Sequence, residues 1–459
     1  MANEKHSFAL GVLGVLGLIL VAFLALSFFH VGGEPAISIV PAMPIIGKRT
    51  PVKIDVAEPR RGLTRVEVEL VQGDKSEVLT IKTYSPRSWL SLRGPQTARD
   101  TIFLEVGRES VPTLKPGTAI IRVVVDRAGT WLRHPGPTTQ EVSLPVRLMP
   151  PSVQLTSTQV YVAQGGCEVV SYRVGESSVH DGVRSGSWWF PGYPLPGGGK
   201  QDRFAFFAVP YDNSEPKVKL VAVDGAGNES EVNIVDKFFP KPPHTDTIQV
   251  TDEFMSKVVP EILSQSPEIQ ERSSILDSYL AINSELRKKD GDVLKELAAK
   301  STQEFLWHKA FEMMPNGKVM SAFADRRTYM YKDRVIDHQD HLGYDLAVTR
   351  QSPVPSSNDG VVALARYFGI FGNAVVVDHG YGIMSLYGHL SSISVNAGQK
   401  VARGDILGKT GETGLAGGDH LHFTVLLQGL PVNPVEWWDG HWIRDRIAKK
   451  LGPAFPFEE

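Results

Sequence analysis

The sequence predicts a multidomain, mainly β protein with one apolar helix at its N-terminus. Short alternating runs of apolar and polar residues, typical of strands, recur between about residues 37 and 238 and again after residue 360. Residues 274–300 instead show the 3.6-residue period of helices. The stretch Phe8–Phe29 is uncharged and long enough to cross a membrane. A chain of 459 residues has room for about three domains.

Shifts in composition predict the domain boundaries. Pro150-Pro151 and the proline-rich residues 239–243 mark two of them. The predicted order is a cytoplasmic tip with a transmembrane helix at 1–30, a β-sandwich at 31–150, an immunoglobulin-like β domain at 151–240, a helical linker or spacer at 241–304, and an antiparallel β domain at 305–459.

The uncharged N-terminal stretch predicts a membrane anchor. A helix rises ~1.5 Å per residue, so Phe8–Phe29 covers the ~30 Å hydrocarbon core. Lys5 and the amino terminus lie before it, which favours a cytoplasmic N-terminus and export of the remaining chain. The alternative is a cleaved signal peptide with Ala25-Leu-Ser27 as its processing site. The length of the run favours the retained anchor.

Two β regions follow. Runs such as 65–70 and 119–125, separated by turn residues, predict a β-sandwich. The second region ends in a strand at 217–224 and then Gly225-Ala-Gly-Asn228, which resembles the closing hairpin of bacterial immunoglobulin-like domains. Its aromatic run at 188–193 is either part of a core, which we favour, or an exposed surface that stacks on sugar rings.

Residues 274–300 predict two helices. Ser273 or Ser274 is a suitable N-cap for the first, and the second begins after Gly291 and covers 292–300. The apolar stripe of the first helix consists of Ile275, Tyr279, Ile282 and Leu286. The pair is either a packed spacer, which we favour, or a cover over the cleft of the domain that follows.

Charge and cysteine content exclude some classes of protein. A net charge of −3 with mixed signs provides no basic surface for nucleic acid. Cys167 is the only cysteine, so an intramolecular disulfide is excluded. An unpaired thiol in an exported protein is most often buried, and we assign it no function.

Three segments of the C-terminal β domain carry the residue types of a zinc site. They are His341-Leu-Gly-Tyr-Asp345, Tyr387-Gly-His389-Leu390 and His420-Leu-His422-Phe423. A catalytic zinc takes three imidazole or carboxylate ligands and keeps one position for water. His341, Asp345 and His422 could supply the ligands, and His389 and His420 would remain to transfer protons. Residues two apart on a strand share a face, so His420 and His422 project side by side.

The other histidines of this part of the chain receive the ordinary interpretation of packed or surface residues. They are His308, His338, His379 and His441.

The segment from about Phe305 to Trp438 resembles the lysostaphin-like zinc metallopeptidases, also called the LytM family of peptidoglycan endopeptidases. The matching motifs are His341-x-Gly343-x-Asp345-x-Ala347, Asn373-Ala-Val-Val-Val-Asp-His-Gly380, Tyr387-x-His389-Leu390, Gly398-x-x-Val401-x-x-Gly404-x-x-Leu407-Gly408, Thr413-Gly414 and His420-Leu-His422-Phe423. By this resemblance, His341, Asp345 and His422 bind one Zn²⁺. His389 and His420 correspond to catalytic histidines that position water and stabilise developing charge. The chain departs from the family at Gly418-Asp419, where small or proline residues are common.

Together with the predicted anchor at Phe8–Phe29, the resemblance implies a membrane-anchored zinc endopeptidase. It would hydrolyse peptide cross-links of bacterial peptidoglycan by metal-activated water, on the periplasmic side of the inner membrane. Its partners would be peptidoglycan peptide stems, the membrane, and envelope proteins that bind the β and helical regions. Two alternatives remain: a non-enzymatic or autoinhibited regulator that activates another cell-wall hydrolase, and an endopeptidase for secreted proteins.

Overall fold

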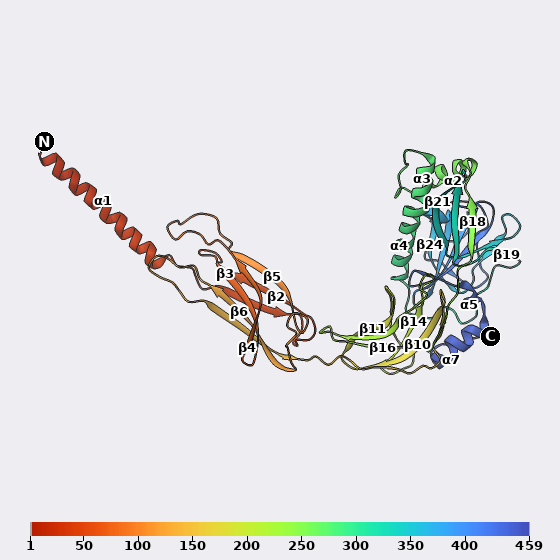
Figure 1. Cartoon of the computed structure of the whole chain (residues 1–459), viewed down its shortest axis with the longest axis horizontal. Helices are drawn as coiled ribbons and strands as arrows, with labels where there is room; N and C mark the ends of the chain where they lie inside the picture. The colour runs from red at the N-terminus through yellow and green to blue at the C-terminus, as the bar shows by residue number, and fades with distance from the viewer. Residues whose placement is uncertain (1, 459) are drawn as a thin grey trace. The chain divides into compact units, whose positions relative to one another are not determined.

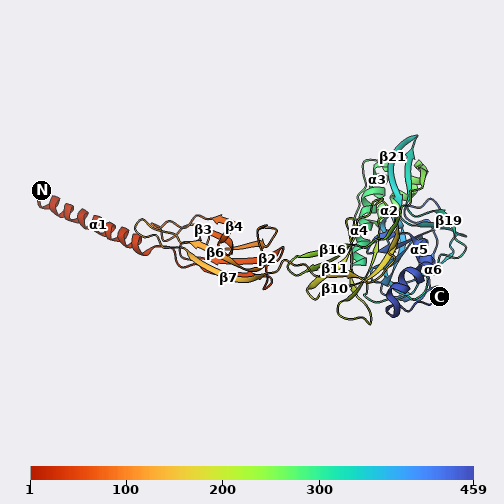
Figure 2. The same ribbon diagram turned by 60° about the horizontal axis from the view of Figure 1, so that its bottom comes forward.

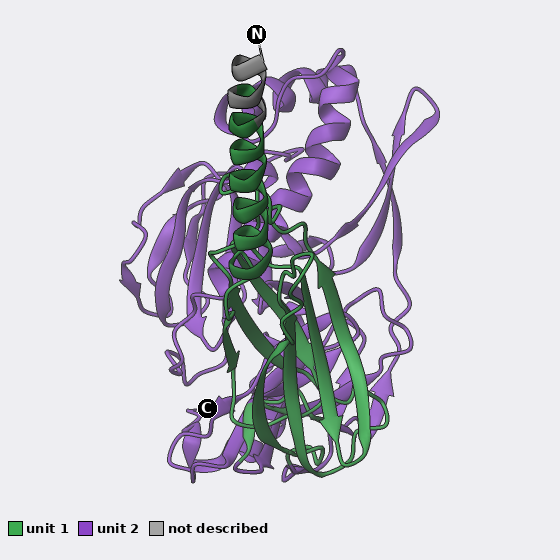
Figure 3. Cartoon of the chain, turned by 90° about the vertical axis from the view of Figure 1, so that its left-hand side faces the viewer, with its two compact units in different colours: residues 1–151, 177–179, 223–229 green, residues 152–176, 180–222, 230–459 purple. Residues whose placement is uncertain are grey.

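The structure, a computed structural model, describes residues 2–458 and is mainly β (Figure 1). It divides into two compact units (Figure 3). Unit 1 contains residues 1–151, 177–179 and 223–229, and unit 2 contains residues 152–176, 180–222 and 230–459. The predicted fold class, mainly antiparallel β with an apolar N-terminal helix, is confirmed. The five narrower domain boundaries stay predictions.

Unit 1 begins with the apolar helix α1 (Ala2–Phe29). Its segment Leu10–Phe29 is long and apolar enough to cross a membrane, a criterion that a signal sequence also meets. Large apolar side chains along this segment are exposed, including Leu13 and Leu18. Such an exposed apolar surface is unfavourable in water and is typical of membrane anchors and of signal sequences.

The rest of unit 1 is a β-sandwich. One sheet has the order β1-β2-β5 and the other β4-β3-β6-β7, with all neighbours antiparallel. The strands are β1 (Ala36–Pro41), β2 (Thr50–Ala57), β3 (Arg65–Gln72), β4 (Lys75–Thr83), β5 (Arg99–Val106), β6 (Gly117–Asp126) and β7 (Thr138–Val146). Alternate residues such as Val52, Ile54, Val66 and Val68 are buried, so the period-2 pattern of the sequence places one face of each sheet in the core.

The region predicted to be immunoglobulin-like, residues 151–240, contains two four-stranded sheets, β13-β14-β10-β8 and β12-β11-β15-β16, and the pair β17-β9. The strands are β8 (Val153–Leu155), β9 (Tyr161–Ala163), β10 (Cys167–Val174), β11 (Ser178–Ser185), β12 (Trp188–Pro191), β13 (Tyr193–Pro194), β14 (Asp202–Ala208), β15 (Val218–Asp224), β16 (Glu229–Asn233) and β17 (Lys237–Phe239). Phe190 and Tyr193 are buried, and Trp188 and Trp189 are half-buried. The aromatic run therefore belongs mainly to the core, not to an exposed sugar-binding surface.

The C-terminal domain is built on an eight-stranded sheet with the order β19-β22-β30-β26-β25-β24-β28 and β31 paired to β30. Its strands are β19 (Lys318–Ser321), β22 (Tyr344–Ala347), β24 (Gly360–Tyr367), β25 (Asn373–Gly380), β26 (Ile383–Leu390), β28 (Lys400–Val401), β30 (Leu421–Leu427) and β31 (Leu430–Val432). A small sheet adds β23 (Pro353–Pro355), β27 (Ser392–Ile393) and β29 (Ile406–Lys409). Short helices, including α5 (Pro434–Trp438), α6 (Gly440–Ile443) and α7 (Lys449–Leu451), end the chain.

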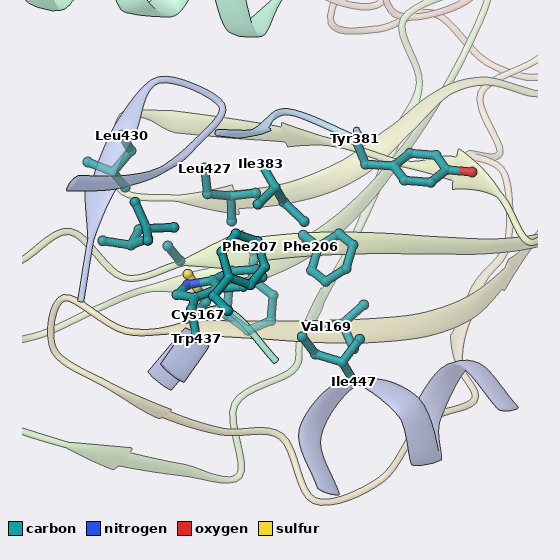
Figure 4. Packing of buried hydrophobic residues seen from close by; sticks show 14 of the residues in the cluster. Cys167, Val169, Phe206, Phe207, Tyr381, Ile383, Leu427, Leu430, Trp437 and Ile447 are labelled. Atoms are coloured by element: carbon teal, nitrogen blue, oxygen red, sulfur yellow. The ribbon is translucent and has the colours of Figure 1, made fainter. Parts of the chain in front are cut away.

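The immunoglobulin-like region and the C-terminal domain share one hydrophobic core (Figure 4). Val169 and Phe206 of the first region lie in the same cluster as Ile383 and Trp437 of the second. Cys167 is buried in this cluster as a free thiol. Because the core is shared, residues of the preceding β region pack against the central sheet of the C-terminal domain and help to stabilise it.

A buried carboxyl lies at this shared core and provides a test of the packing. The backbone N–H of Cys167 donates to Glu436 Oε2 at 2.7 Å. Burial raises the pKa of Glu436 from 4.5 to about 8. Between these values the folded chain binds more protons than the unfolded chain, so the free energy of unfolding falls as the pH rises through that window.

We expect Glu436→Gln to weaken this pH dependence and to raise the Tm above that of the unmodified protein at pH 8. Gln keeps an acceptor oxygen for the Cys167 N–H but carries no charge to bury. Thermal unfolding at pH 5 and pH 8 measures the effect, and Glu271→Gln at an exposed carboxyl is the control. An equal pH dependence in Glu436→Gln and the unmodified protein would contradict the assignment.

The segment before the C-terminal domain differs from a plain helical spacer. β18 (Thr245–Gln249) pairs in parallel with β20 (Asp325–Tyr331), which forms a hairpin with β21 (Arg334–His341). α2 (Asp252–Gln265) follows β18 and was not predicted. The hairpin that carries β21 lies next to the helices of this segment (Figure 2).

The two helices predicted for residues 274–300 form one continuous helical run. α3 (Ile275–Ala281) continues through a π-helical turn, η1 (Ile282–Leu286), into α4 (Arg287–Ala298). Ser274 is the N-cap and accepts from the Asp277 N–H, but the predicted start after Gly291 is wrong. A glycine inside a helix lowers the helix stability by only ~1 kcal/mol relative to alanine. Packing of the buried Leu294 and Ala298 offsets that loss.

Candidate metal centre and its cavity

Three strands of the C-terminal domain bring His341, Asp345 and His422 together. His341 ends β21, and the two residues Leu342 and Gly343 turn the chain into β22, which carries Asp345. β22 pairs with β30 so that Asp345 lies directly opposite His422.

The ligand-type atoms of these three residues form a nearly equilateral triangle. Asp345 Oδ1 lies 3.0 Å from His341 Nε2 and 3.0 Å from His422 Nδ1, and the two histidine nitrogens are 3.1 Å apart. Ligand atoms ~2.0–2.2 Å from a tetrahedral ion would be roughly 3.3–3.5 Å apart. The triangle is therefore close to the size that a single metal ion requires.

Hydrogen bonding shows that His341 turns a lone pair into this triangle. Its Nδ1 lies 2.9 Å from the carbonyl oxygen of Ala322, which can only accept. His341 therefore carries its proton on Nδ1 when neutral, and Nε2 is an acceptor.

His422 also directs a nitrogen lone pair into the triangle, but it carries its proton on Nε2 where His341 carries it on Nδ1. Its Nε2 is 2.9 Å from Thr424 Oγ1, whose hydroxyl donates to the carbonyl oxygen of Leu342 at 2.9 Å. The Thr424 oxygen therefore accepts from the His422 Nε2–H, which leaves Nδ1 as an acceptor. Two imidazole lone pairs and a carboxylate oxygen thus converge without a proton between them. This arrangement is unfavourable unless a cation binds it, so the residues fit a metal ion.

Gly343 permits the close packing behind His422. A Cβ at this position would lie 2.6 Å from His422 Nε2 and 2.6 Å from Thr424 Oγ1. Any side chain would displace the imidazole or the threonine, so the glycine of the His-x-Gly-x-Asp motif has a packing role at the site.

Arg327 of β20 orients the carboxylate. Its Nη2 donates to Asp345 Oδ2 at 2.9 Å, so Oδ1 remains directed at the two histidines. Burial raises the pKa of the Asp345 carboxyl, but His341, His420 and His422 outweigh this effect and hold the pKa well below its usual range. Asp345 is thus an anion at neutral pH, as a metal ligand must be.

His389 lies beside the triangle in an unusual backbone conformation. Its φ is 62°, and the register between β25 and β26 shifts near it, so a β-bulge turns the side chain toward the site. His389 Nδ1 donates to the carbonyl oxygen of Thr413 at 2.8 Å and leaves Nε2 as the free nitrogen. Burial, followed by the charges of His420 and His422, lowers the pKa of His389 well below 6.5.

His420 directly precedes β30, and its ring lies 4.8 Å from that of His389 between centroids. Its Nδ1 donates to the carbonyl oxygen of Gly418 at 2.7 Å, and its Nε2 lies 3.5 Å from Asp345 Oδ1. Burial lowers the pKa of His420, but Asp345 outweighs it and raises the pKa above 6.5. Both histidines therefore turn Nε2, not Nδ1, toward the space beside the triangle.

The remaining histidines of the domain lie outside this group. His379 is buried, and its ring nitrogens contact the carbonyl oxygen of Asp359 and the hydroxyl of Ser385 at 2.7 Å each. His338 and His441 are exposed. These positions agree with packed or surface roles.

The five histidine and aspartate side chains line a cavity of about 390 Å³. The segment before the C-terminal domain also contributes to the lining, through Ile248, Phe254, Tyr279 and Arg287. Arg327 and Tyr329 of β20 line the cavity too, and Ile370, Phe371 and Leu415 add apolar surface. The helical segment is thus part of the cavity wall, and the sequence motifs did not indicate Tyr279, Arg287 or Arg327.

We expect Thr424→Val to weaken metal binding about 10- to 100-fold without unfolding the protein. Valine has nearly the same shape but cannot accept from His422 Nε2–H, so the tautomer that turns Nδ1 toward the metal loses its support. Competition with a chromophoric chelator measures the affinity. Thr424→Ser, which keeps the hydroxyl, should retain most of it, and an unchanged affinity in Thr424→Val would contradict the role of this bond.

Comparison with known proteins places the C-terminal part of the chain in a family. The model described as "Peptidase family M23" matches residues 339–434. The chain is 34% identical over 185 residues to peptidoglycan DD-endopeptidase ShyA of Vibrio cholerae, covering 39% of this chain and 40% of that protein. It is 42% identical over 95 residues to DD-carboxypeptidase/endopeptidase Mpg of Neisseria meningitidis, covering 21% of this chain and 22% of that protein. The chain thus spans less than half the length of these relatives.

Among solved structures, a Pseudomonas aeruginosa chain assigned to peptidase M23 is similar with 23% identity and a TM-score of 0.37. The alignment covers 61% of this chain and 95% of that chain. The family match confirms the resemblance predicted from the histidine motifs.

Proposed function

From the peptidase family M23 domain at residues 339–434, we propose that this chain is a membrane-anchored zinc endopeptidase that hydrolyses peptide cross-links of peptidoglycan. The observation that carries the proposal is the convergence of three acceptors, from His341, Asp345 and His422, at 3.0–3.1 Å. The similarity to a relative named as a peptidoglycan DD-endopeptidase supports the substrate class.

His341 Nε2, Asp345 Oδ1 and His422 Nδ1 would hold the zinc ion. Imidazole and carboxylate are zinc ligands, and three of them leave one position open. When bound, zinc lowers the pKa of water and polarises a carbonyl oxygen. Arg327 and Thr424 would keep the ligand atoms oriented toward the ion through Asp345 Oδ2 and His422 Nε2.

His389 and His420 would handle protons beside the ligands. Each has its Nδ1–H bound to a backbone carbonyl, of Thr413 and Gly418 respectively, so each presents Nε2 to the cavity. An Nε2 without a proton accepts one from the attacking water, and a protonated Nε2 donates one to the oxyanion or to the leaving amine. We propose that the two histidines share these tasks.

We propose that α1 is retained as the anchor and that the rest of the chain lies on the periplasmic side of the inner membrane. The exposed apolar surface of Leu10–Phe29 and the charge of Lys5 before it support this orientation. The amino-terminal sequence of the mature protein tests the anchor, since a start near Phe28 would show cleavage.

One observation favours a second candidate function, an autoinhibited regulator of another cell-wall hydrolase. Phe254, Tyr279 and Arg287 from the helical segment form one wall of the metal-site cavity. If that wall prevents a cross-linked peptide from entering, the chain would bind zinc but would not cleave.

The test uses the full chain in detergent with cross-linked peptidoglycan sacculi, with and without a chelator. The proposed activity would release uncross-linked muropeptides, and the chelator would stop the release. Mass spectrometry of the products identifies the bond. Bound zinc without any release would favour the regulator, and cleavage of casein but not of sacculi would favour a protein substrate.

A further inference from the structure

The cavity lining carries hydrogen-bond donors and positive charge that the metal-ligand residues do not fully use. The groups are Tyr279 of α3, Arg287 of α4 and Arg327 of β20, of which Arg327 uses its Nη2 to bind Asp345. All three precede residues 339–434, which match the peptidase family. They are therefore contributed by the part of this chain that folds against the peptidase domain.

Tyr279 and Arg327 carry polar atoms that lack partners. The Tyr279 side chain is fully buried, and its hydroxyl has no hydrogen-bond partner within residues 2–458. The Nε of Arg327 is buried and also has none among these residues, although its Nη2 binds Asp345. A buried donor without a partner is unfavourable, and both residues line the cavity, so a ligand that accepts hydrogen bonds there would satisfy them.

Arg287 adds an unneutralised charge. Its Nε and Nη2 donate to the carbonyl oxygen and the side-chain oxygen of Asn283, at 3.0 and 2.7 Å, and both acceptors are neutral. In the described part of the chain, residues 2–458, no ion pair to Arg287 is formed.

The carboxylates near Arg287 are engaged elsewhere. Asp337 accepts from the amides of Asn283 and Gln339, and Asp290 accepts from the Ile370 N–H. Asp345, which lines the cavity, is bound by Arg327 and the histidines. The cavity lining therefore contains two arginines and one carboxylate, and its net charge favours an anionic ligand.

We propose that Arg287, Tyr279 and the Nε of Arg327 form a carboxylate-binding subsite for the substrate. Arginine and a phenolic hydroxyl are suitable donors for a planar carboxylate, and Ile370, Phe371 and Leu415 add apolar surface to the same cavity. The subsite rests on the proposed peptidoglycan endopeptidase function and narrows its substrate.

The types of peptide cross-link differ in whether a free carboxylate lies next to the scissile bond, and this difference indicates which carboxylate the subsite would bind. When alanine is linked to diaminopimelate, the nitrogen of the scissile bond is attached to a carbon that bears a free carboxylate. A glycine bridge has no carboxylate at that position. The subsite therefore favours a cross-link whose leaving residue carries a free carboxylate next to the cleaved bond, and it disfavours glycine bridges.

The test compares two peptide dimers that differ at one group. One dimer keeps the free carboxylate on the leaving residue, and the other has a carboxamide there. The zinc-loaded full chain in detergent should have a kcat/KM about 10- to 100-fold higher for the carboxylate dimer, mainly through a lower KM.

Variants at the subsite should remove this preference. In Arg287→Met and in Tyr279→Phe, the two dimers should differ by less than about threefold, while zinc content stays unchanged. Arg287→Lys should restore part of the preference because it restores the charge. Lys288→Met removes a neighbouring exposed charge outside the cavity and should leave the preference intact.

The outcomes separate the subsite from the activity. Cleavage of both dimers at equal rates, or an unchanged preference in both Arg287→Met and Tyr279→Phe, overturns the subsite while the endopeptidase stands. If neither dimer is cleaved, the affinity of each dimer for the zinc-loaded chain is measured by calorimetry instead. Tighter binding of the carboxylate dimer that Arg287→Met abolishes supports the subsite without the activity, and equal binding of both dimers overturns it.

Discussion

His422→Ala is expected to lose bound zinc and peptide hydrolysis together. The substitution removes one of only three ligand atoms and leaves Asp345 Oδ1 and His341 Nε2, 3.0 Å apart, as an incomplete site. Loss of a residue that merely orients a zinc ligand costs about 10- to 100-fold in affinity, so loss of the ligand itself should cost more than about 100-fold. Hydrolysis should fall to the uncatalysed background.

The measurement is metal content after dialysis, together with turnover of cross-linked sacculi. His441→Ala is the matched control, because His441 is exposed and lies outside the cavity. Thermal unfolding of the metal-free proteins should show that both variants are folded. Stoichiometric zinc in His422→Ala, bound as tightly as in the unmodified protein, would refute the assignment of the ligands.

Only part of the predicted metal site follows from local geometry in the sequence. The spacing of His420 and His422 follows from the two-residue period of a strand, and a short turn brings Asp345 close to His341. The direct pairing of Asp345 with His422 joins residues of two strands far apart in the chain. No periodicity indicates which strands pair, so family resemblance was needed to join the two halves of the site.

The donors opposite the metal could not be predicted in this way. Tyr279 belongs to an apolar stripe, where its hydroxyl is indistinguishable from an ordinary core residue, and Arg287 is one of several charged residues that follow it. They reach the cavity because α3 and α4 fold against the β20–β21 hairpin and the loop at Ile370. Only tertiary packing determines that arrangement.

For the fold as well, local patterns could be predicted from the sequence, whereas contacts between distant segments could not. Alternation of apolar residues predicted strands of the sandwich such as those at 65–70 and 119–125, which are β3 and β6, because one buried face per sheet imposes a period of two. The predicted helix break at Gly291 failed because tertiary packing outweighs a small propensity cost. The shared core of Phe206 and Trp437 could not be predicted from the sequence. Apolar contacts are not directional, so the pattern of apolar residues shows that a side chain will be buried but not which residues it will contact.

His389→Ala and His420→Ala are expected to keep zinc but to lose about 10²- to 10⁴-fold in kcat, the usual contribution of a positioned acid or base. Neither side chain belongs to the triangle of ligand atoms, so metal content should be unchanged. His379→Ala is a poor control because His379 is buried, whereas His338→Ala removes an exposed histidine of the same domain. Full turnover in either variant would remove that histidine from the mechanism.

The double variant distinguishes shared from separate tasks. If His389 and His420 act in one proton-transfer step, the loss in the double variant should be close to the larger single loss, because the step fails once either is absent. If they stabilise the same transition state independently, through separate atoms, the two losses should multiply. Their rings lie 4.8 Å apart, and both present Nε2 to the same space, so we expect the combined loss to be less than the product. Single-turnover rates with zinc-loaded protein would measure this coupling without a contribution from product release.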